Sequence, residues 1–346
     1  MNQTTDIRFS YETLETWGRQ ALADTGMAKD EIDAVLQVLL ATNLQGRDSH
    51  GIHMLTSYAD RFKSIPHREM QVVSDQGAGC LIDGGNHTGP YTSLFALERA
   101  MEKADRFGIG LAVVQESCHN GAIGYYTQLA AEKGYIALSA TTVMPLIAPW
   151  GGLEAFLGNN PFAIAFPYKK MPIVLDIALT VAARQKIFSY ARDGKSLPDG
   201  WAMDKEGNPT NDPNEAIDGL LMPVGGHKGA GICLMIDLIL GSLTGSYSRA
   251  ICPNTVTDRE QHIAHLFFLL NPEFYVSRDV LDARVEQYVA DLKQVRRKAD
   301  VDQILLPGEL EWNTTQERKA NGIPISAGDL KKLNDFADRI GIDRLG

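Results

Sequence analysis

Cysteine is scarce in this chain of 346 residues: there are four, and no two of them form a Cys-x-x-Cys pair. Their spacings fit neither a zinc site nor a disulfide framework, which excludes the small domains that such links hold together. Long apolar runs are also absent, since the strongest, at 234–236, is soon interrupted, and we expect no transmembrane segment. The first residues show no basic region leading into an apolar stretch, so we expect no signal peptide and a cytoplasmic protein.

Positive charge is in deficit as well, with 33 Lys and Arg against 43 Asp and Glu and a formal net charge of −10. A surface of this sign disfavours nucleic acids and anionic membranes as partners, because both bind basic proteins. The balance of 44% hydrophobic and 22% charged residues is that of a soluble globular enzyme. The length predicts two or three lobes around a sizeable core.

The Rossmann fingerprint is missing too, because no G-x-G-x-x-G follows a strand and opens a helix. The nearest glycine-rich segment, 225–231, leads into an apolar helix, so its N–H groups could bind a phosphate at a helix N-terminus. Lys228 would add a point charge for the same anion. A glycine-rich turn with a solvated lysine explains the segment equally well.

The hydrophobic pattern predicts a mixture of helices and strands. Residues 192–214 are polar and rich in Gly, Pro and Asp, which predicts a long loop that shapes a site. We expect two helices within 10–45, further helices at 91–107, 125–133, 230–243, 276–299 and 326–342, and strands at 110–114, 135–140, 162–166, 173–175 and 265–270.

The densest group of reactive side chains follows the second predicted helix. Residues 48–51 combine a carboxylate, the hydroxyl of Ser49, the imidazole of His50 and a glycine, and His53 comes soon after. An imidazole near its ordinary pKa can donate or accept a proton at neutral pH, as catalysis at a carbonyl requires. So short a match also arises by chance, so its meaning depends on the rest of the chain.

Asp176 and His119 are the other polar residues that predicted strands place at their ends. Asp176 follows the strand at 173–175, where a carboxylate in a cleft can orient a histidine and stabilise its charged form, although it can also cap a turn. His119 lies in the polar loop 117–121. Cys118, next to it, is either a nucleophile or a small buried thiol, and we favour the buried thiol.

The remaining histidines predict no metal site. His262 and His265 form an H-x-x-H pair, and His67 and His87 lie elsewhere, but we take the H-x-x-H spacing itself to carry no accompanying acid or third ligand.

Six motifs occur in an order that resembles the malate/L-lactate dehydrogenase family, a group of NAD(P)-dependent oxidoreductases without a classical Rossmann domain. The similarity extends from about residue 8 to residue 340. The family includes malate, sulfolactate and ureidoglycolate dehydrogenases, diketogulonate reductases, and reductases of piperideine- and pyrroline-2-carboxylate. The motifs are 48–53, 117–126, 148–152 with 157–161, 175–178, 225–229 and 306–309.

This resemblance implies an α/β fold in which a largely antiparallel sheet binds NAD(P)H and a helical domain is built from both chain ends. We expect the helical domain at 1–75 plus 281–346 and the NAD(P)-binding and catalytic domain at 76–280. The resemblance also implies a homodimer, with the active site in a cleft between the domains.

Residue by residue, the resemblance makes His50 the proton donor to the substrate's carbonyl or imine, with Ser49 and Asp176 as its relay partners. His119 aligns with a histidine that has the acid/base role in some members, so the two imidazoles compete, and we favour His50. Tyr58 matches a position that lines the substrate pocket.

The cofactor is expected to be NAD or NADP. A 2′-phosphate needs a nearby cation, for which Arg184 and Lys186 are candidates, although both also suit a solvated surface. The positions that match the cofactor-contacting set are Asp176, Ile177, Ala178, Leu179, Thr180, Val181, Ala182, His227, Lys228, Gly308, Glu309 and Leu310.

The chain departs from the family pattern at Met54, where members commonly have an arginine that holds the substrate carboxylate. Losing that charge-assisted pair costs a carboxylate ligand on the order of 1.5–3 kcal/mol. Either Arg47 or Arg61 replaces it, or the substrate has a less charged group there, which puts simple malate or lactate in doubt.

The sequence therefore predicts reversible hydride transfer from NAD(P)H to C2 of a 2-oxo acid or cyclic imino acid. One alternative is a protein that binds or senses NAD(P) on the same scaffold without turnover, which the change at Met54 favours. A second is a hydrolase with Cys118 as nucleophile and no cofactor.

Overall fold

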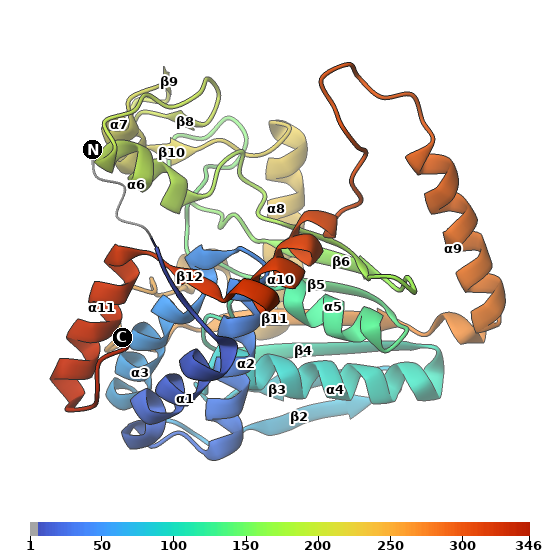
Figure 1. The fold of residues 1–346 in the computed structure, drawn as a ribbon, viewed down its shortest axis with the longest axis horizontal. Helices are drawn as coiled ribbons and strands as arrows, with labels where there is room; N and C mark the ends of the chain where they lie inside the picture. Colours follow the sequence, from blue (N-terminus) through green and yellow to red (C-terminus); the bar gives the residue numbers. More distant parts are fainter. Residues whose placement is uncertain (1–5) are drawn as a thin grey trace.

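The computed structural model describes residues 6–346, and a seven-stranded sheet forms its centre (Figure 1). Its strands lie in the order β2-β3-β4-β11-β5-β6-β7, and all neighbours are antiparallel except β3 and β4, which confirms the expected fold class. The strands are β2 (Gln71–Gln76), β3 (Gly79–Asp83), β4 (Ile109–Ser117), β5 (Ile136–Thr141), β6 (Phe162–Phe166), β7 (Ile173–Ile177) and β11 (Ile263–Leu270).

Helices cover both faces of this sheet because successive side chains of a strand point to opposite faces. Ala112 and Val114 of β4 lie in a core with α4 (Gly89–Phe107) and α5 (Gly124–Glu132). Val113, between them, packs on the other face in a core with Leu240 of α8 (His227–Thr244). The sheet is therefore buried between α4 and α5 on one side and α8 on the other.

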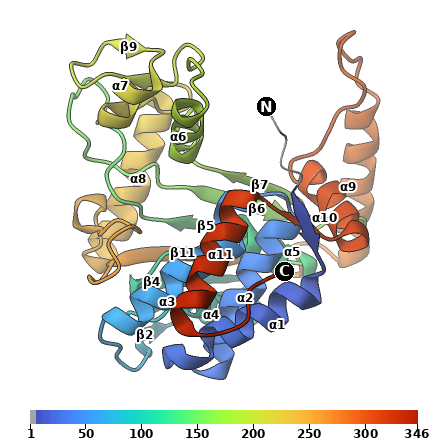
Figure 2. The ribbon, with the colours of Figure 1, turned by 60° about the vertical axis from the view of Figure 1, so that its left-hand side comes forward.

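A helical cluster from both ends of the chain packs beside the sheet (Figure 2). Trp17, Leu36, Leu55 and Phe336 share its core. The two ends are also joined where β1 pairs antiparallel with β12. The elements are β1 (Ile7–Phe9), α1 (Tyr11–Leu22), α2 (Lys29–Leu44), α3 (Leu55–Ser64), α10 (Glu309–Asn321), β12 (Ile323–Ile325) and α11 (Ala327–Ile340).

A smaller unit lies above the carboxyl end of β7 and has its own core, which includes Ile187, Leu197 and Leu221 (Figure 1). Residues 192–214, expected to be one loop, instead contain two short strands and the start of a helix. The unit consists of α6 (Arg184–Arg192), β8 (Ala202–Met203), β9 (Pro209–Thr210), α7 (Pro213–Asp218) and β10 (Leu220–Leu221). α9 (Arg278–Lys293) and the segment after it stand away from the body.

The helices and strands expected from strong hydrophobic periodicity are present, with ends that differ by a few residues. The helix expected at 276–299 ends at Lys293, and the one expected to begin at residue 230 begins at His227. Elements that bury few residues show no hydrophobic periodicity in the sequence: β2 has six exposed residues, and no residue of α10 is buried.

The expected domain boundaries at 75 and 281 fall inside β2 and α9, and this division stays a prediction.

α8 qualifies the expectation that no apolar segment is long enough to span a membrane. It has 18 residues with a mean hydropathy of 1.2, and 39% of it is buried. A core helix passes the same test of length and composition, so this observation is weak evidence for a membrane span.

His265 of β11 lies fully buried in a hydrogen-bonded network beneath the His119 loop. Its Nε2 donates to the carbonyl oxygen of Cys118 at 3.1 Å, and its Nδ1 lies 2.8 Å from the hydroxyl of Thr141. Burial lowers the pKa of His265 to about 3, so the ring stays neutral in the folded protein. The unfolded chain instead takes up this proton below pH about 6.5.

Acidification should therefore destabilise the protein through His265, because the unfolded state binds a proton that the folded state does not. By pH 5 the loss of unfolding free energy from this group is about 2 kcal/mol. We expect His265→Gln to be less stable at pH 7 but to lose less stability between pH 7 and 5 than the wild type, as measured by urea unfolding. Phe267→Leu, a buried change without titration, should destabilise equally at both pH values, and an unchanged pH slope in His265→Gln would contradict this prediction.

Candidate active site

Asn43 and Arg318 hold the loop that carries His50. The side chain of Asn43, near the end of α2, accepts the N–H of Ile52 and donates to Asp48, both at 2.6 Å. Arg318 of α10 donates to the two carboxylate oxygens of Asp48 at 2.7 and 2.9 Å. A Cβ on Gly51 would lie 2.3 Å from the amide of Asn43, so this position requires glycine. The loop is thus anchored to α2 and to the C-terminal part of the chain.

The structure brings Ser49, His50, Tyr58 and His119 together, as the sequence predicts. The rings of His50 and His119 are stacked, with centroids 5.6 Å apart and an angle of 21° between their planes. The Ser49 hydroxyl lies 2.9 Å from Nδ1 of His50. On the other side, the buried Tyr58 hydroxyl lies 2.9 Å from Nδ1 of His119 and 2.8 Å from its carbonyl oxygen. Two imidazoles therefore share one site, each with its own hydroxyl partner.

A backbone hydrogen bond favours one tautomer of His119. The N–H of Gly121 donates to Nδ1 at 3.3 Å, which favours a neutral ring with its hydrogen on Nε2, provided that the Tyr58 hydroxyl beside Nδ1 does not take the role of acceptor. The backbone N–H of His119 in turn donates to Gln261 at 2.9 Å. In this tautomer His119 is a hydrogen-bond donor through Nε2.

Both imidazoles are neutral at pH 7 in this state. Burial lowers the pKa of His119 to about 3, and the charge of a protonated His50 adds to the shift. Burial also lowers the pKa of His50 to about 4, with further contributions from His53 and Arg47. A negative charge bound beside His50 would raise its pKa towards neutrality.

Asp176 lies at the end of β7 but does not bond to His50. Its carboxylate accepts the N–H of Gly124 at 3.1 Å and forms an ion pair with Arg47. Arg47 also pairs with Glu311 of α10 at 3.2 Å. Within residues 6–346 no hydrogen bond joins Asp176 to His50, and the relay between them stays a prediction.

The residues expected to hold the substrate carboxylate are occupied elsewhere. Met54 is half-buried and packs against the core of the helical cluster. The buried guanidinium of Arg61 donates to three carbonyl oxygens in the segment 253–259. Since Arg47 is paired with Asp176, both arginines that could replace the missing one already have partners.

Residues of the expected cofactor set lie together after β7. The backbone of 179–181 pairs with that of 222–224 through two hydrogen bonds of 2.9 Å. His227 and Lys228, both exposed, then form the first turn of α8. The tertiary structure therefore joins two parts of the expected cofactor set that lie about fifty residues apart in sequence.

Gly308 to Leu310 lie beside an earlier part of β7, near Val174. The N–H of Val174 in β7 donates to the carbonyl of Pro307 at 3.0 Å, and a Cβ on Gly308 would lie 3.1 Å from the Val174 backbone. Glu309 accepts the N–H of Leu306 at 2.8 Å and so closes the turn that starts α10. A crevice of about 20 Å³ beside Gly308 has room for about one water molecule.

The residues after β7 fit a nicotinamide dinucleotide. The hydroxyl of Thr180 is buried and has no hydrogen-bond partner within the described part of the chain, so a ligand can satisfy it. The N–H groups that begin α8 lack a side-chain cap, and Lys228 lies beside them, which suits a phosphate. Exposed Val181 offers apolar surface for a ring. Together these residues can bind both the polar and the apolar parts of the cofactor.

Cys118 is unsuited to act as a nucleophile. It is buried, and burial raises the pKa of its thiol to about 12, so almost no thiolate exists at neutral pH. Its sulfur lies 3.5 Å from the carbonyl oxygen of Asn86. These observations favour the expected structural thiol over a hydrolase.

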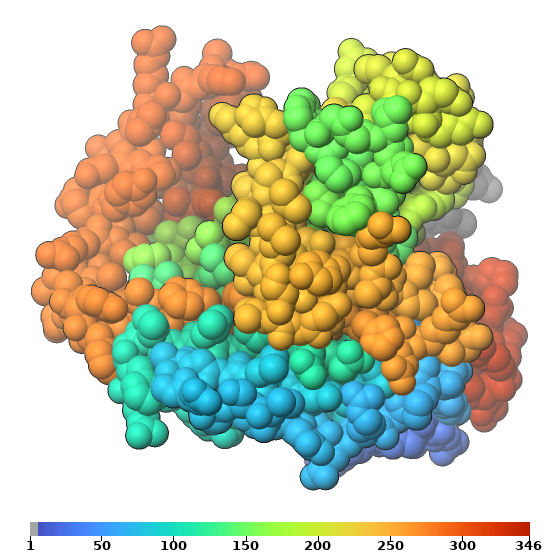
Figure 3. Space-filling view, turned by 180° about the vertical axis from the view of Figure 1, so that it is seen from behind, coloured from blue at the N-terminus to red at the C-terminus, as the bar shows by residue number. Residues whose placement is uncertain are grey.

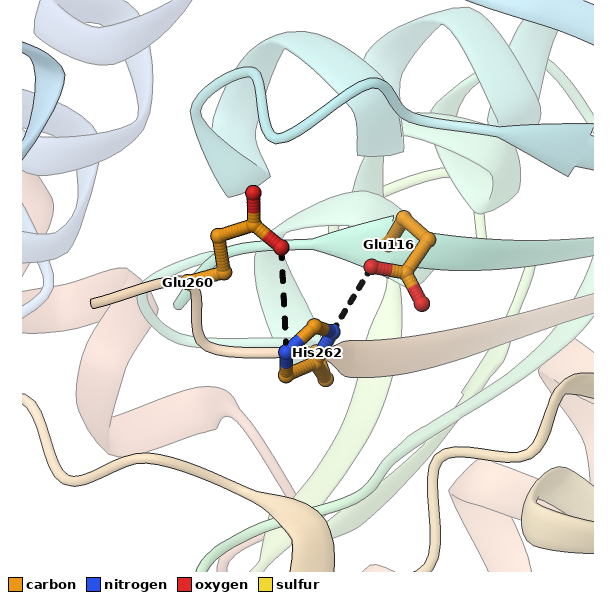
Figure 4. A group of neighbouring side chains, drawn as sticks. All are labelled: Glu116, Glu260 and His262. Atoms are coloured by element: carbon orange, nitrogen blue, oxygen red, sulfur yellow. Dashed lines mark hydrogen bonds and ion pairs between the residues drawn. The ribbon is translucent and has the colours of Figure 1, made fainter. Parts of the chain in front are cut away.

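His262 lies between two glutamates, Glu116 and Glu260, at one end of β4 and β11 (Figure 4). Its Nδ1 is 2.7 Å from Glu116, and its Nε2 is 3.8 Å from Glu260. Glu260 lies two residues before His262 in the sequence and was overlooked there, whereas Glu116 comes close to His262 only through folding. His265 is not part of this cluster, because its ring is buried below. The absence of a metal site stays a prediction.

The sequence of residues 9–334 matches the family model described as malate/L-lactate dehydrogenase. The chain belongs to the malate/L-lactate dehydrogenase family. As a member of this family it is an oxidoreductase, and its cofactor is NAD or NADP.

Individual relatives agree with this assignment over nearly the whole chain. A malate dehydrogenase from Pyrococcus horikoshii is 33% identical over 98% of this chain and 97% of its own length. The structure of sulfolactate dehydrogenase from Methanocaldococcus jannaschii superposes with a TM-score of 0.91 at 29% identity, over 97% of this chain and 98% of that one. A delta1-piperideine-2-carboxylate reductase from Pseudomonas syringae gives a TM-score of 0.84 at 26% identity, over 96% of this chain and all of its own.

Several residues that organise this family member's site gave no signal in the sequence. Asn43, Gln261 and Arg318 look like ordinary polar residues of helices or loops. Gln261 and Arg318 act over long separations in the chain, as when Arg318 reaches Asp48 across 270 positions, whereas Asn43 bonds residues five and nine positions away. Such partners become visible only when the chain is folded.

Breaking the Arg318–Asp48 pair should loosen the His50 loop. We expect Arg318→Gln to lower the unfolding free energy by about 1–3 kcal/mol, since a charge-assisted bond to a half-buried carboxylate is lost. A displacement of His50 by about 1 Å would lower kcat up to roughly 100-fold. Urea unfolding and steady-state kinetics measure the two effects.

Arg8→Gln is the matched control, because Arg8 pairs with Glu317 of the same helix in an exposed salt bridge. It should change neither stability nor kcat appreciably. A normal kcat in a folded Arg318→Gln variant would contradict the anchoring role.

Proposed function

We propose that this protein reduces a 2-oxo acid or a cyclic imino acid with NAD(P)H, and catalyses the reverse oxidation, with His50 as the proton donor. The observation that carries the proposal is the stacked pair of His50 and His119, beside residues after β7 that fit the cofactor. The relatives named malate dehydrogenase, sulfolactate dehydrogenase and piperideine-2-carboxylate reductase support this substrate class. When bound, NAD(P)H supplies the hydride.

The hydrogen bonds of the two histidines favour a division of roles. Nδ1 of His119 accepts the N–H of Gly121, so Nε2 can donate a hydrogen bond to the substrate's oxygen or nitrogen and keep its proton. His50 has an exposed partner, Ser49, through which a proton can return from solvent. We therefore assign proton transfer to His50 and orientation of the substrate to His119 and Tyr58.

Charge in the complex would bring His50 into its working range. The pKa of His50 is about 4 in this state, too low for an efficient acid at pH 7. A bound anionic substrate raises it, because opposite charges stabilise the imidazolium. Asp176 would contribute through space, to an extent limited by its pairing with Arg47.

Replacing His50 tests the assignment. We expect His50→Ala to lower turnover at least about 100-fold, within the usual range for general acid catalysis, while NAD(P)H still binds. Stopped-flow oxidation of bound NADH and NADPH with a panel of 2-oxo acids and cyclic imines measures turnover, and cofactor fluorescence measures binding.

His119→Ala serves as the comparison in the same assay. Near-normal turnover in His50→Ala together with an inactive His119→Ala would reverse the assignment of the proton donor. If the wild type binds NAD(P)H but oxidises it with no member of the panel, a binding or sensing protein replaces the proposed enzyme.

We also propose a cytoplasmic homodimer that forms through the outer face of α8. The four cysteines are free, as expected in a reducing compartment. The surface of α8 and the residues after it is uncovered at the rear of the molecule (Figure 3). An apolar face this extensive is typical of an interface. Its exposed members are Ile232, Leu234, Met235, Leu238, Ile239 and Leu243, each 41–55% accessible.

A charge on this face should prevent dimer formation. We expect Met235→Glu to be monomeric in multi-angle light scattering, whereas the wild type is dimeric, because an unpaired carboxylate would be buried at the interface. Val73→Glu, an equally exposed change on edge strand β2, should stay dimeric. A monomeric wild type, or a dimeric Met235→Glu, would contradict this interface.

A further inference from the structure

Glu116, Glu260 and His262 bring three metal-ligating side chains together at one end of β4 and β11 (Figure 4). Nδ1 of His262 lies 2.7 Å from a carboxylate oxygen of Glu116, and Nε2 lies 3.8 Å from an oxygen of Glu260. One ligand atom from each residue lies within 4.8 Å of the other two. The three side chains are 25–39% exposed, so an ion can reach them from solvent.

The charge of this cluster is not balanced by the chain. Two carboxylates flank a single imidazole, so the cluster stays negative whether or not His262 is protonated. Neither Glu116 nor Glu260 forms a salt bridge with a lysine or arginine within residues 6–346. Carboxylates this close repel each other, and a bound cation removes that repulsion. The cluster therefore favours a positive ligand.

The backbone on both strands is turned so that the side chains converge. Glu116 and His262 have φ angles of 50° and 57°, in the left-handed region, and they are two of the three described non-glycine residues that do so. The register of β4 and β11 also shifts between Ile263 and His265, and such irregularities re-aim side chains. Backbone strain of this kind is typical of functional sites.

The donor set fits a divalent transition metal ion such as Zn²⁺. Zinc binds nitrogen and carboxylate oxygen at about 2.0–2.2 Å, which places the ligand atoms of a tetrahedral ion roughly 3.4 Å apart. Since the atoms already lie within 4.8 Å, rotations of the half-exposed glutamates bring them to this spacing. The imidazole favours Zn²⁺ over Mg²⁺ and Ca²⁺, which prefer oxygen ligands.

Gln261 connects this cluster to the candidate active site. It lies between two of the three ligands in sequence, and its buried side chain accepts the backbone N–H of His119 at 2.9 Å. Glu116 lies three residues before His119 on the neighbouring strand. An ion held by the cluster would thus restrain both segments that support the His119 loop.

We propose that Glu116, Glu260 and His262 bind one divalent transition metal ion of the Zn²⁺ type, which joins the end of β4 to the start of β11. The ion takes no part in hydride or proton transfer, and it acts by holding the backbone on either side of His119. This proposal replaces the expectation, drawn from the sequence, that the histidines form no metal site. It is independent of the substrate that the enzyme reduces.

A protonated His262 that bridges the two glutamates is the alternative, and such an ion-pair triad binds no metal. Calorimetric titration of the EDTA-treated, dialysed protein with zinc chloride at pH 7 separates the two. We expect one ion per chain. In Glu116→Gln, Glu260→Gln and His262→Gln the affinity should fall at least about tenfold each, because outer-shell partners of a ligand alone contribute 10- to 100-fold.

His87→Gln is the matched control. His87 also bonds a glutamate, Glu31 at 2.9 Å, but the pair belongs to no three-residue cluster within residues 6–346, so zinc should bind as in the wild type. A wild type without saturable zinc binding would overturn the proposal in favour of the ion-pair triad. Unchanged binding in all three cluster variants would also overturn it, because the ion would then lie elsewhere, as at the thiol of Cys252.

Hydrogen exchange gives a second readout that needs no variant. The His119 amide bonds Gln261, so its exchange through local opening should slow about tenfold when free Zn²⁺ is ten times its Kd. Amides of α11, which lies in the helical cluster, should exchange as before. Bound zinc that leaves exchange unchanged at both 117–121 and 260–263 would place the ion outside this cluster and overturn the proposal.

Discussion

The site depends on the ion pair between Asp48 and Arg318. Through it, α10 from the C-terminal part of the chain fixes a loop that follows α2 near the N-terminus. Asn43 completes the anchor by bonding both Asp48 and the backbone of Ile52. The same helix, α10, also reaches Arg47 through Glu311, so it links the His50 loop to the Asp176 end of the sheet. Both chain ends must therefore pack correctly before the two imidazoles can meet.

Burial then determines the chemistry that these imidazoles offer. Removing His50 and His119 from water favours their neutral forms and lowers the pKa of each. An acid at this position needs a compensating negative charge, which the substrate can supply when it binds. Proton transfer and substrate charge are thus coupled. This coupling is consistent with a site in which Arg47 and Arg61 already have partners.

Much of the architecture could be predicted from the sequence because it rests on local periodicity. The apolar spacing of α2 and the continuous apolar run of β4 indicate their type without tertiary information. β2, α6 and α10 escaped prediction because they bury too little of themselves to impose a pattern. In the candidate site, Ser49, His50, Tyr58 and His119 could be named from motifs. The actual partner of Asp176, Arg47, could not, since 129 positions separate them.

The sequence by itself determined the class of protein that the composition indicates, the family and the types of reactive residue, because these depend only on amino-acid composition and on the order of the motifs. Only the tertiary structure decided which charges neutralise one another. Arg47 and Arg61 look equally free in the sequence, yet one is paired with Asp176 and the other with backbone carbonyls. Lys186 and Arg192, which carry no motif together, line a cavity beside Ser49. The physical reason is that a charge acts over a few ångströms of space, whatever its distance along the chain.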